Sequence, residues 1–226
     1  MLRMERVIYI IPTPIGNMED ITLRSIRALN ESDMILAEDT RVSKKILKHY
    51  NIKTKLSPYH SFNEHKIIES LIEKIGVGLK ISLICDAGTP GISDPGYLLI
   101  RECIRRNINV ICLPGATACI PAIIKSGLSC EKFTFEGFIP TKKKRKKTLE
   151  YISQNRNTTI IYESPHRIIK TLHNLYEYCG NRKIAVIKEI SKLHEKAYRG
   201  AISEVILKIE KSVIKGEFII VLDGKR

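Results

Sequence analysis

The sequence predicts an α/β protein made of two domains, and three observations support this class. Short apolar runs, such as residues 7–11 and 81–84, alternate with stretches whose apolar residues recur at helical spacing. The chain has 226 residues, enough for two compact domains of about 100 residues each. With 43% hydrophobic and 27% charged residues, its composition is that of an ordinary globular protein. Alternating strands and helices favour a parallel sheet covered by helices.

The first domain is expected to span residues 1–117, with strands and helices in alternation. An amphipathic helix is indicated at 63–75, where Ile67, Ile68, Leu71, Ile72 and Ile75 recur at helical spacing. Gly127 is a typical stop for a helix that begins at 116. The expected strands are 7–11, 33–37, 80–85 and 109–113, and the expected helices are 22–30, 42–50, 63–75, 97–106 and 116–126.

The second domain is expected to span residues 118–226 and to contain a mixed α/β sheet. Pro165 is typical of the first turn of a helix. The expected strands are 132–138, 158–162, 183–188, 197–201 and 218–222, and the expected helices are 142–155, 165–179 and 203–211.

Several classes of protein are disfavoured by the composition. No apolar run approaches the ~18–20 residues that cross a bilayer, and the N-terminus lacks the features of a signal peptide. We therefore expect a cytoplasmic protein with no membrane contact. The six cysteines form no C-x-x-C pair, and the six histidines include no pair at i, i+4 spacing. The cysteines are expected to be reduced core residues, and no metal site is expected.

The most informative loop is residues 85–96, which read CDAGTPGISDPG directly after an apolar run. Glycine permits positive φ and close backbone approach, whereas proline fixes φ. A loop of this composition at the C-terminal end of a strand is where α/β proteins bind small ligands. The alternative is a long surface turn, which we rank second because a simple connection needs fewer residues.

Polar or Gly/Pro-rich loops also follow other expected strands. Each has a plain structural alternative, such as a rigid connection or, for Asp39 and Thr40, a helix cap. Together they predict a cleft between the two domains. The loops are 12–17 (PTPIGN), 38–41 (EDTR), 114–118 (PGATA), 163–167 (ESPHR) and 189–195 (EISKLHE).

Six segments in this order resemble the signatures of one known family: PTPIGN, AEDTR, DAGTPGISDPG, LPGA, YESPHR and KGEF, from about residue 7 to 222. The chain resembles the ribosomal RNA small subunit methyltransferase I family of the tetrapyrrole methylase superfamily. The resemblance implies transfer of a methyl group from S-adenosylmethionine to the ribose 2′-hydroxyl of a cytidine in the decoding region of 16S rRNA. It further implies two α/β domains with the cofactor cleft between them, a homodimer, and 16S rRNA or the small ribosomal subunit as partner.

The same resemblance assigns residues to the cofactor, and it places Asp39 and Arg41 on the RNA side. We expect Asp86 and Asp94 to shape the loop and hold the cofactor. The full cofactor set is Pro12, Asp86, Ala87, Gly88, Thr89, Ile92, Ser93, Asp94, Pro114, Gly115, Ala116, Glu163 and Ser164.

A ribose hydroxyl is a poor nucleophile until a base accepts its proton. We take Asp39, Arg41 and Glu189 as the catalytic candidates, with Asp39 as base and Arg41 orienting a phosphate or the carboxylate. An equally weighted alternative is that Asp39 caps a helix and pairs with Arg41. Further base candidates are Glu38, His166 and Lys192.

The net charge of +14 suggests a polyanionic partner, although a lysine-rich proteome would produce the same excess. A run of six cations is more specific, because a solvated helix face usually mixes charges of both signs. We expect this run to contact RNA phosphates, which gives affinity without sequence readout. It consists of Lys142, Lys143, Lys144, Arg145, Lys146 and Lys147.

Two alternative functions remain open at this point. One is a methylase of the same superfamily that acts on a tetrapyrrole or on diphthine. A porphyrinoid would call for a large aromatic cleft, and aromatic residues make up only 6% of this chain. The other is a non-catalytic RNA-binding factor in ribosome assembly, which S-adenosylmethionine would not stabilise.

Overall fold

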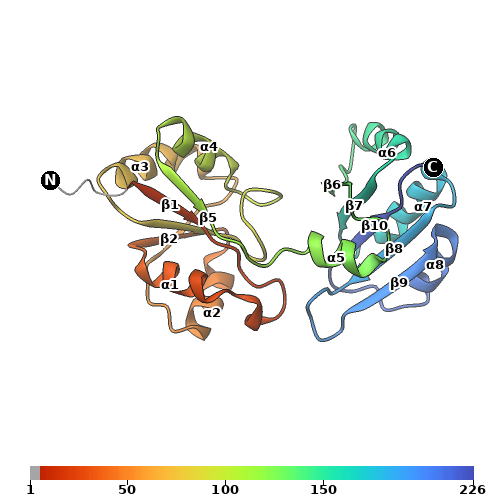
Figure 1. Cartoon of the computed structure of the whole chain (residues 1–226), viewed down its shortest axis with the longest axis horizontal. Helices are drawn as coiled ribbons and strands as arrows, with labels where there is room; N and C mark the ends of the chain where they lie inside the picture. Colours follow the sequence, from red (N-terminus) through yellow and green to blue (C-terminus); the bar gives the residue numbers. More distant parts are fainter. Residues whose placement is uncertain (1–5) are drawn as a thin grey trace. The chain divides into compact units, whose positions relative to one another are not determined.

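The computed structural model describes residues 6–226, and the chain divides into two compact units, residues 1–117 and 118–226 (Figure 1). Each unit contains its own five-stranded sheet. Within residues 6–226, no helix is both long enough and apolar enough to cross a membrane.

The first unit is a parallel sheet with the strand order β3-β2-β4-β1-β5. Its central strands are buried along their whole length, as parallel strands covered on both faces require. The strands are β1 (Val7–Ile10), β2 (Met34–Ala37), β3 (Leu56–Pro58), β4 (Ile81–Ile84) and β5 (Asn109–Cys112).

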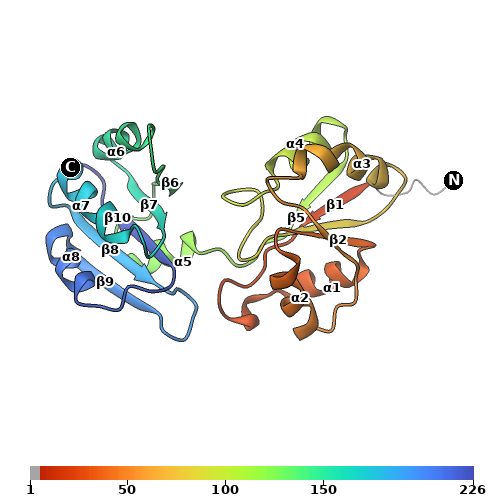
Figure 2. The same cartoon turned by 180° about the vertical axis from the view of Figure 1, so that it is seen from behind.

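Helices cover both faces of this sheet. A short 3-10 helix, η1 (Met18–Asp20), precedes α1 (Leu23–Glu31), which packs with α2 (Thr40–His49) on one face. The helices α3 (Glu64–Gly76) and α4 (Tyr97–Arg105) pack on the other face, as Figures 1 and 2 show from opposite sides. The chain therefore leaves the neighbouring strands β1 and β4 toward opposite faces. In doubly wound sheets, such a switch point opens the crevice where ligands bind.

The second unit has a mixed sheet with the order β6-β7-β10-β8-β9. Only β6 and β7 are parallel, and the other neighbours pair antiparallel. The strands are β6 (Phe133–Phe138), β7 (Thr158–Glu163), β8 (Lys183–Lys188), β9 (Lys196–Ala201) and β10 (Phe218–Leu222). The mixed sheet confirms the predicted fold class for this unit.

Helices α6 (Arg145–Gln154), α7 (Ile168–Cys179) and α8 (Ile202–Glu210) share one apolar core with the sheet of the second unit. Helix α5 (Cys119–Ser126) packs on β8, β9 and β10 outside that core. It ends at Gly127, which adopts a left-handed conformation with φ of 72°.

Four expectations about elements were wrong. Helix α5 begins at Cys119 and not at 116. The edge strand β3 was not predicted, because Leu56-Ser57-Pro58 is short and contains a proline. Helix α6 begins at Arg145 and not at 142. Helix α7 begins at Ile168 and not at Pro165, because residues 164–167 form a turn in which both Arg167 N and Ile168 N donate to Ser164 O.

Candidate functional site

The loops that follow β1 and β4 are joined at the switch point by Thr13. Thr13 N donates to Gly88 O at 2.9 Å, and Gly88 N donates back to Thr13 O at 3.0 Å. The buried Thr13 hydroxyl also donates to Cys85 O at 2.9 Å. Gly88 has φ of 84°, a conformation that favours glycine. Thr13 lies between the two prolines of the PTPIGN loop, and its hydrogen bonds fasten the β1 and β4 loops together.

The loop that follows β5 belongs to the same assembly. The Thr89 hydroxyl donates to Ala116 O at 3.2 Å. A Cβ added to Gly115 would lie 2.8 Å from Pro12 Cβ, which real Cβ contacts do not reach. Gly115 is therefore needed where the β1 and β5 loops meet. Several predicted cofactor residues have exposed backbone or side chains on these loops, namely Ala87, Ile92, Ser93, Pro114 and Gly115.

Three carboxylates, Glu38, Asp86 and Asp94, gather at the carboxyl ends of β2 and β4. Burial, and then the negative charges of Asp94, Asp86 and Asp39, raise the pKa of Glu38 to about 7. Burial also raises the pKa of Asp86 and of Asp94. Among residues 6–226, no ion pair joins any of the three to a basic side chain. This end of the sheet therefore holds excess negative charge that a cationic ligand would neutralise.

Asp39 has a different environment from its neighbour Glu38. Its side chain caps α2 by accepting from Arg41 N at 2.8 Å, and it pairs with the Arg41 guanidinium at 2.6 Å. The hydrogen bonds from Arg41 lower the pKa of Asp39 to about 2. Asp39 N in turn donates to Asp86 Oδ1 at 3.0 Å. The cap and the ion pair correspond to the structural alternative considered for this residue, and they leave Arg41 87% exposed.

In the second unit, the Glu163 carboxylate is fully engaged. It accepts from Ser164 N at 2.8 Å and from the Thr171 hydroxyl at 2.6 Å. It also pairs with the Arg167 guanidinium at 2.6 Å, and its side chain has no exposed surface. The predicted cofactor role of Glu163 and Ser164 stays a prediction. The observed contacts make Glu163 a framework residue that fixes the turn between β7 and α7.

Glu189 lies in a loop where it and Ser191 have positive φ values of 53° and 62°. Its carboxylate accepts from Glu217 N at 2.8 Å and from Lys192 Nζ at 2.9 Å. Burial acts to raise the pKa of Glu189, but these two partners outweigh it and the net pKa is lowered. Glu189 and Lys192, two of the base candidates, are therefore bound to each other. His166, a third, is exposed in the turn before α7.

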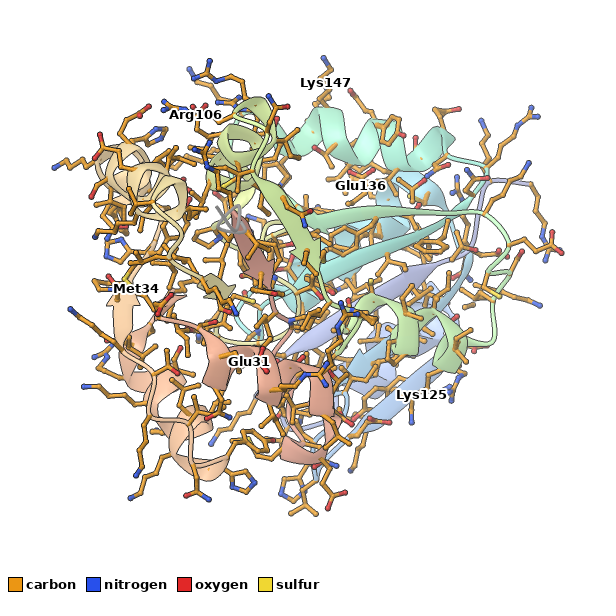
Figure 3. All side chains as sticks on the ribbon, turned by 60° about the vertical axis from the view of Figure 1, so that its left-hand side comes forward. Glu31, Met34, Arg106, Lys125, Glu136 and Lys147 are labelled. Carbon is orange, nitrogen blue, oxygen red and sulfur yellow. The ribbon has the colours of Figure 1, made fainter. Side chains whose placement is uncertain are left out.

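The six consecutive cations do not behave alike. Arg145 donates to the Asn174 side chain at 2.9 Å and to the Thr171 hydroxyl at 2.9 Å, so it joins α6 to α7. The five lysines are exposed, and Lys147 points away from the ribbon in Figure 3. Arg145 is thus part of the packing of the second unit, and the predicted RNA contact concerns Lys142, Lys143, Lys144, Lys146 and Lys147.

The fold and the site define a class: an α/β methylase with a doubly wound first unit and a mixed second sheet. The profile of the family Tetrapyrrole (Corrin/Porphyrin) Methylases matches residues 7–206, and the chain belongs to this family. It is therefore a methyltransferase that uses S-adenosylmethionine as methyl donor.

Similar proteins with curated names agree with this assignment. The chain is 44% identical over 218 residues to "Ribosomal RNA small subunit methyltransferase I" of Halalkalibacterium halodurans, covering 96% of this chain and 75% of that protein. It is 41% identical over 216 residues to the protein of the same name from Thermotoga maritima, covering 96% of this chain and 97% of that protein.

Solved structures share the fold at much lower identity. Diphthine synthase matches with a TM-score of 0.72 at 12% identity, covering 96% of this chain and 90% of that one. Uroporphyrin-III-C-methyltransferase from Thermus thermophilus matches with a TM-score of 0.68 at 18% identity, covering 97% and 94%. These likenesses confirm the two-unit methylase fold.

The residues of the first unit fit the charge of S-adenosylmethionine, which carries a sulfonium and an ammonium group. The carboxylates Asp86 and Asp94 supply the negative charge that these cations need. Gly115 allows the β1 and β5 loops that carry predicted cofactor residues to meet, because a side chain there would clash with Pro12. The same carboxylates would repel an anionic cofactor.

Proposed function

We propose that this protein transfers the methyl group of S-adenosylmethionine to the ribose 2′-hydroxyl of a cytidine in the decoding region of 16S rRNA. The observation that carries the proposal is the 40–44% identity, over 96% or more of this chain, to proteins named ribosomal RNA small subunit methyltransferase I. The exposed lysines that precede α6 and begin it, from Lys142 to Lys147, support a polyanionic substrate.

Bound S-adenosylmethionine supplies an already activated methyl group, so the work of the chain is to align the hydroxyl and accept its proton. The carboxylates Asp86 and Asp94 would hold the cationic cofactor. Glu38 suits the role of proton acceptor better than Asp39, because its pKa of about 7 matches the operating pH. Asp39 is committed to Arg41, whose exposed guanidinium is available to orient a phosphate.

The test is methyl transfer to protein-free 16S rRNA and to small subunits that lack the modification, followed by mapping of the methylated nucleotide. We expect one 2′-O-methylcytidine. In the same assay, Glu38→Gln lowers the rate by ~10²–10⁴-fold, whereas Asp39→Asn, which still caps α2, has a much smaller effect. Both variants should bind S-adenosylmethionine when measured by calorimetry.

A larger loss of rate in Asp39→Asn than in Glu38→Gln would mean that Asp39, and not Glu38, is the base. A product methylated on a base, or a tetrapyrrole accepted in place of RNA, would refute the proposed substrate.

We further infer a homodimer, as the family resemblance implies. Helix α5 supports it, because its Ile120 and Ile124 side chains are 46% and 66% exposed. Exposed apolar side chains on one helix are typical of an interface. Light scattering on the purified protein measures the mass, and a monomer at micromolar concentration would contradict the inference.

A further inference from the structure

A second basic region lies in the first unit, separate from the lysine run. Residues 40–63 contain six lysines and arginines and neither aspartate nor glutamate. The whole chain, by contrast, has 38 cations and 24 acidic residues. The six cations of the segment, all exposed, are Arg41, Lys44, Lys45, Lys48, Lys53 and Lys55.

Four of these cations form a stripe along α2. Arg41, Lys44, Lys45 and Lys48 are spaced by three or four residues, so they lie on one face of the helix. The stripe spans roughly 10 Å at 1.5 Å of rise per residue. Like charges at this spacing repel each other, so helix stability does not explain why four cations share one face.

The stripe leads into a groove with a volume of about 410 Å³. Lys44, Lys48 and Lys53 line this groove together with the apolar side chains of Leu47, Ile52 and Leu56. The volume lies within the range of pockets that hold small organic groups. A lining of apolar side chains, Asn51, Thr54 and three lysines suits a nucleotide unit, which combines flat base faces, polar base edges and an anionic phosphate.

Two arginines of α4 and its C-terminus show what a neutralised cation looks like in this unit, and Arg41 of the stripe is likewise paired, with Asp39. Arg105 and Arg106 both bind Glu102, and Arg106 also binds Glu69. Within residues 6–226, no ion pair involves Lys44, Lys45, Lys48 or Lys53. The charge around the groove is therefore not neutralised by the protein.

The groove lies at the end of the sheet where the parallel strands begin, opposite the end that carries the carboxylates. Helix α2 begins next to Asp39, at the carboxyl ends of the parallel strands, and ends near the start of β3. Its ten residues span about 15 Å. A ligand in the groove would thus be remote from the reacting methyl group, while the stripe connects the two places.

We propose that the stripe and groove of α2 bind the phosphate backbone of the RNA substrate at a position away from the methylated nucleotide. This inference rests on the proposed function, because it takes RNA to be the substrate. The site holds RNA through charge and shape, so it contributes affinity and orientation without reading sequence.

The test compares two charge-matched double variants by fluorescence anisotropy with a fragment of 16S rRNA at several salt concentrations. Lys44→Gln with Lys48→Gln alters the groove. Lys66→Gln with Lys74→Gln removes two exposed helical lysines from α3, on the other face of the same sheet. The groove variant should lower the slope of log K against log salt by about 1.4, since each phosphate contact with a single strand contributes ~0.7. The α3 variant should match the wild type.

Calorimetry with S-adenosylmethionine accompanies both variants and should give wild-type affinity, which shows that the first unit is folded. Equal RNA slopes for the groove variant and the wild type would overturn the inference. Loss of binding to intact small subunits without loss of binding to protein-free RNA would also overturn it, because the partner would then be a ribosomal protein.

The methyl-transfer assay of the proposed function, run beside these binding measurements, separates the two claims. Methylation of rRNA with no effect of the groove variant supports the proposed function and refutes the groove. A groove-dependent RNA slope without any methyl transfer refutes the proposed function and supports the groove.

Discussion

Two places in the molecule bury carboxylates in opposite ways. In the second unit, Glu163 receives an arginine, a hydroxyl and a backbone N–H, so its charge is satisfied by the protein. In the first unit, burial raises the pKa of Glu38, Asp86 and Asp94, and neighbouring carboxylates raise that of Glu38 and Asp94 further. Within residues 6–226, none of the three forms an ion pair with a basic side chain. A satisfied buried carboxylate indicates framework, whereas crowded unpaired carboxylates indicate a place for a ligand.

The largest effect on the free energy of unfolding is expected at Glu163, whose charge is satisfied by the protein. Glu163→Ala leaves the Arg167 guanidinium without its anion and the Thr171 hydroxyl without its acceptor. We expect the free energy of unfolding to fall by about 3 kcal/mol, measured by urea denaturation. The control is Glu131→Ala, an exposed carboxylate at which the change should stay within about 0.5 kcal/mol. Equal stabilities for the two variants would show that the Glu163 contacts are not structural.

A smaller effect on the free energy of unfolding is expected in the run of six cations, where the packed Arg145 lies next to exposed lysines. Arg145→Ala removes the bonds to Asn174 and Thr171 and should cost about 2 kcal/mol of stability. Lys143→Ala should cost less than about 0.5 kcal/mol, but it should reduce the salt slope of RNA binding by ~0.7. Urea denaturation measures the stability of each variant, and a salt titration measures the slope of its RNA binding. A stability loss at Lys143 as large as that at Arg145 would contradict this division.

The smallest effect on stability is expected at the crowded carboxylates. The pKa of Glu38 is raised from 4.5 to about 7 in the folded state, so the folded protein binds more protons than the unfolded chain between these pH values. Stability must then decrease as the pH rises from 4.5 through 7. Because the side chain is partly solvated, we expect a loss on the order of 1 kcal/mol.

Glu38→Gln removes that titration. Urea midpoints at pH 5 and pH 8 should therefore lie closer together for the variant than for the wild type. A wild-type midpoint that rises over this range, with the same rise in the variant, would mean that Glu38 is not crowded by the other carboxylates.

Local amino-acid composition was sufficient to predict the parts of the fold where glycine and proline restrict the backbone. The Gly/Pro loop of residues 85–96 was expected after a buried strand, and it follows β4. The loop 12–17 after β1, with its two prolines, had a rigid connection as its structural alternative, and Thr13 hydrogen-bonds this loop to the loop after β4. In contrast, β3 was missed because a three-residue edge strand has too few residues for a period-two pattern.

Tertiary context decided the parts of the site that sequence alone did not resolve. Arg145 looks like its lysine neighbours in the sequence, and only the packing of α6 against α7 turns it inward. Glu38 and Asp39 are adjacent, yet one is crowded by carboxylates and the other is paired with Arg41. The α2 stripe is visible in the sequence at helical spacing, but the groove beside it depends on where β3 lies.

The hydrogen bonds between the β1, β4 and β5 loops have a consequence for the thermodynamics of ligand binding. Thr13, Gly88 and Thr89 hold these loops in place by contacts made during folding. The conformational entropy of the loops is therefore lost when the chain folds and not when a ligand binds to them. A ligand that binds such a preorganised surface retains more of its contact energy as affinity.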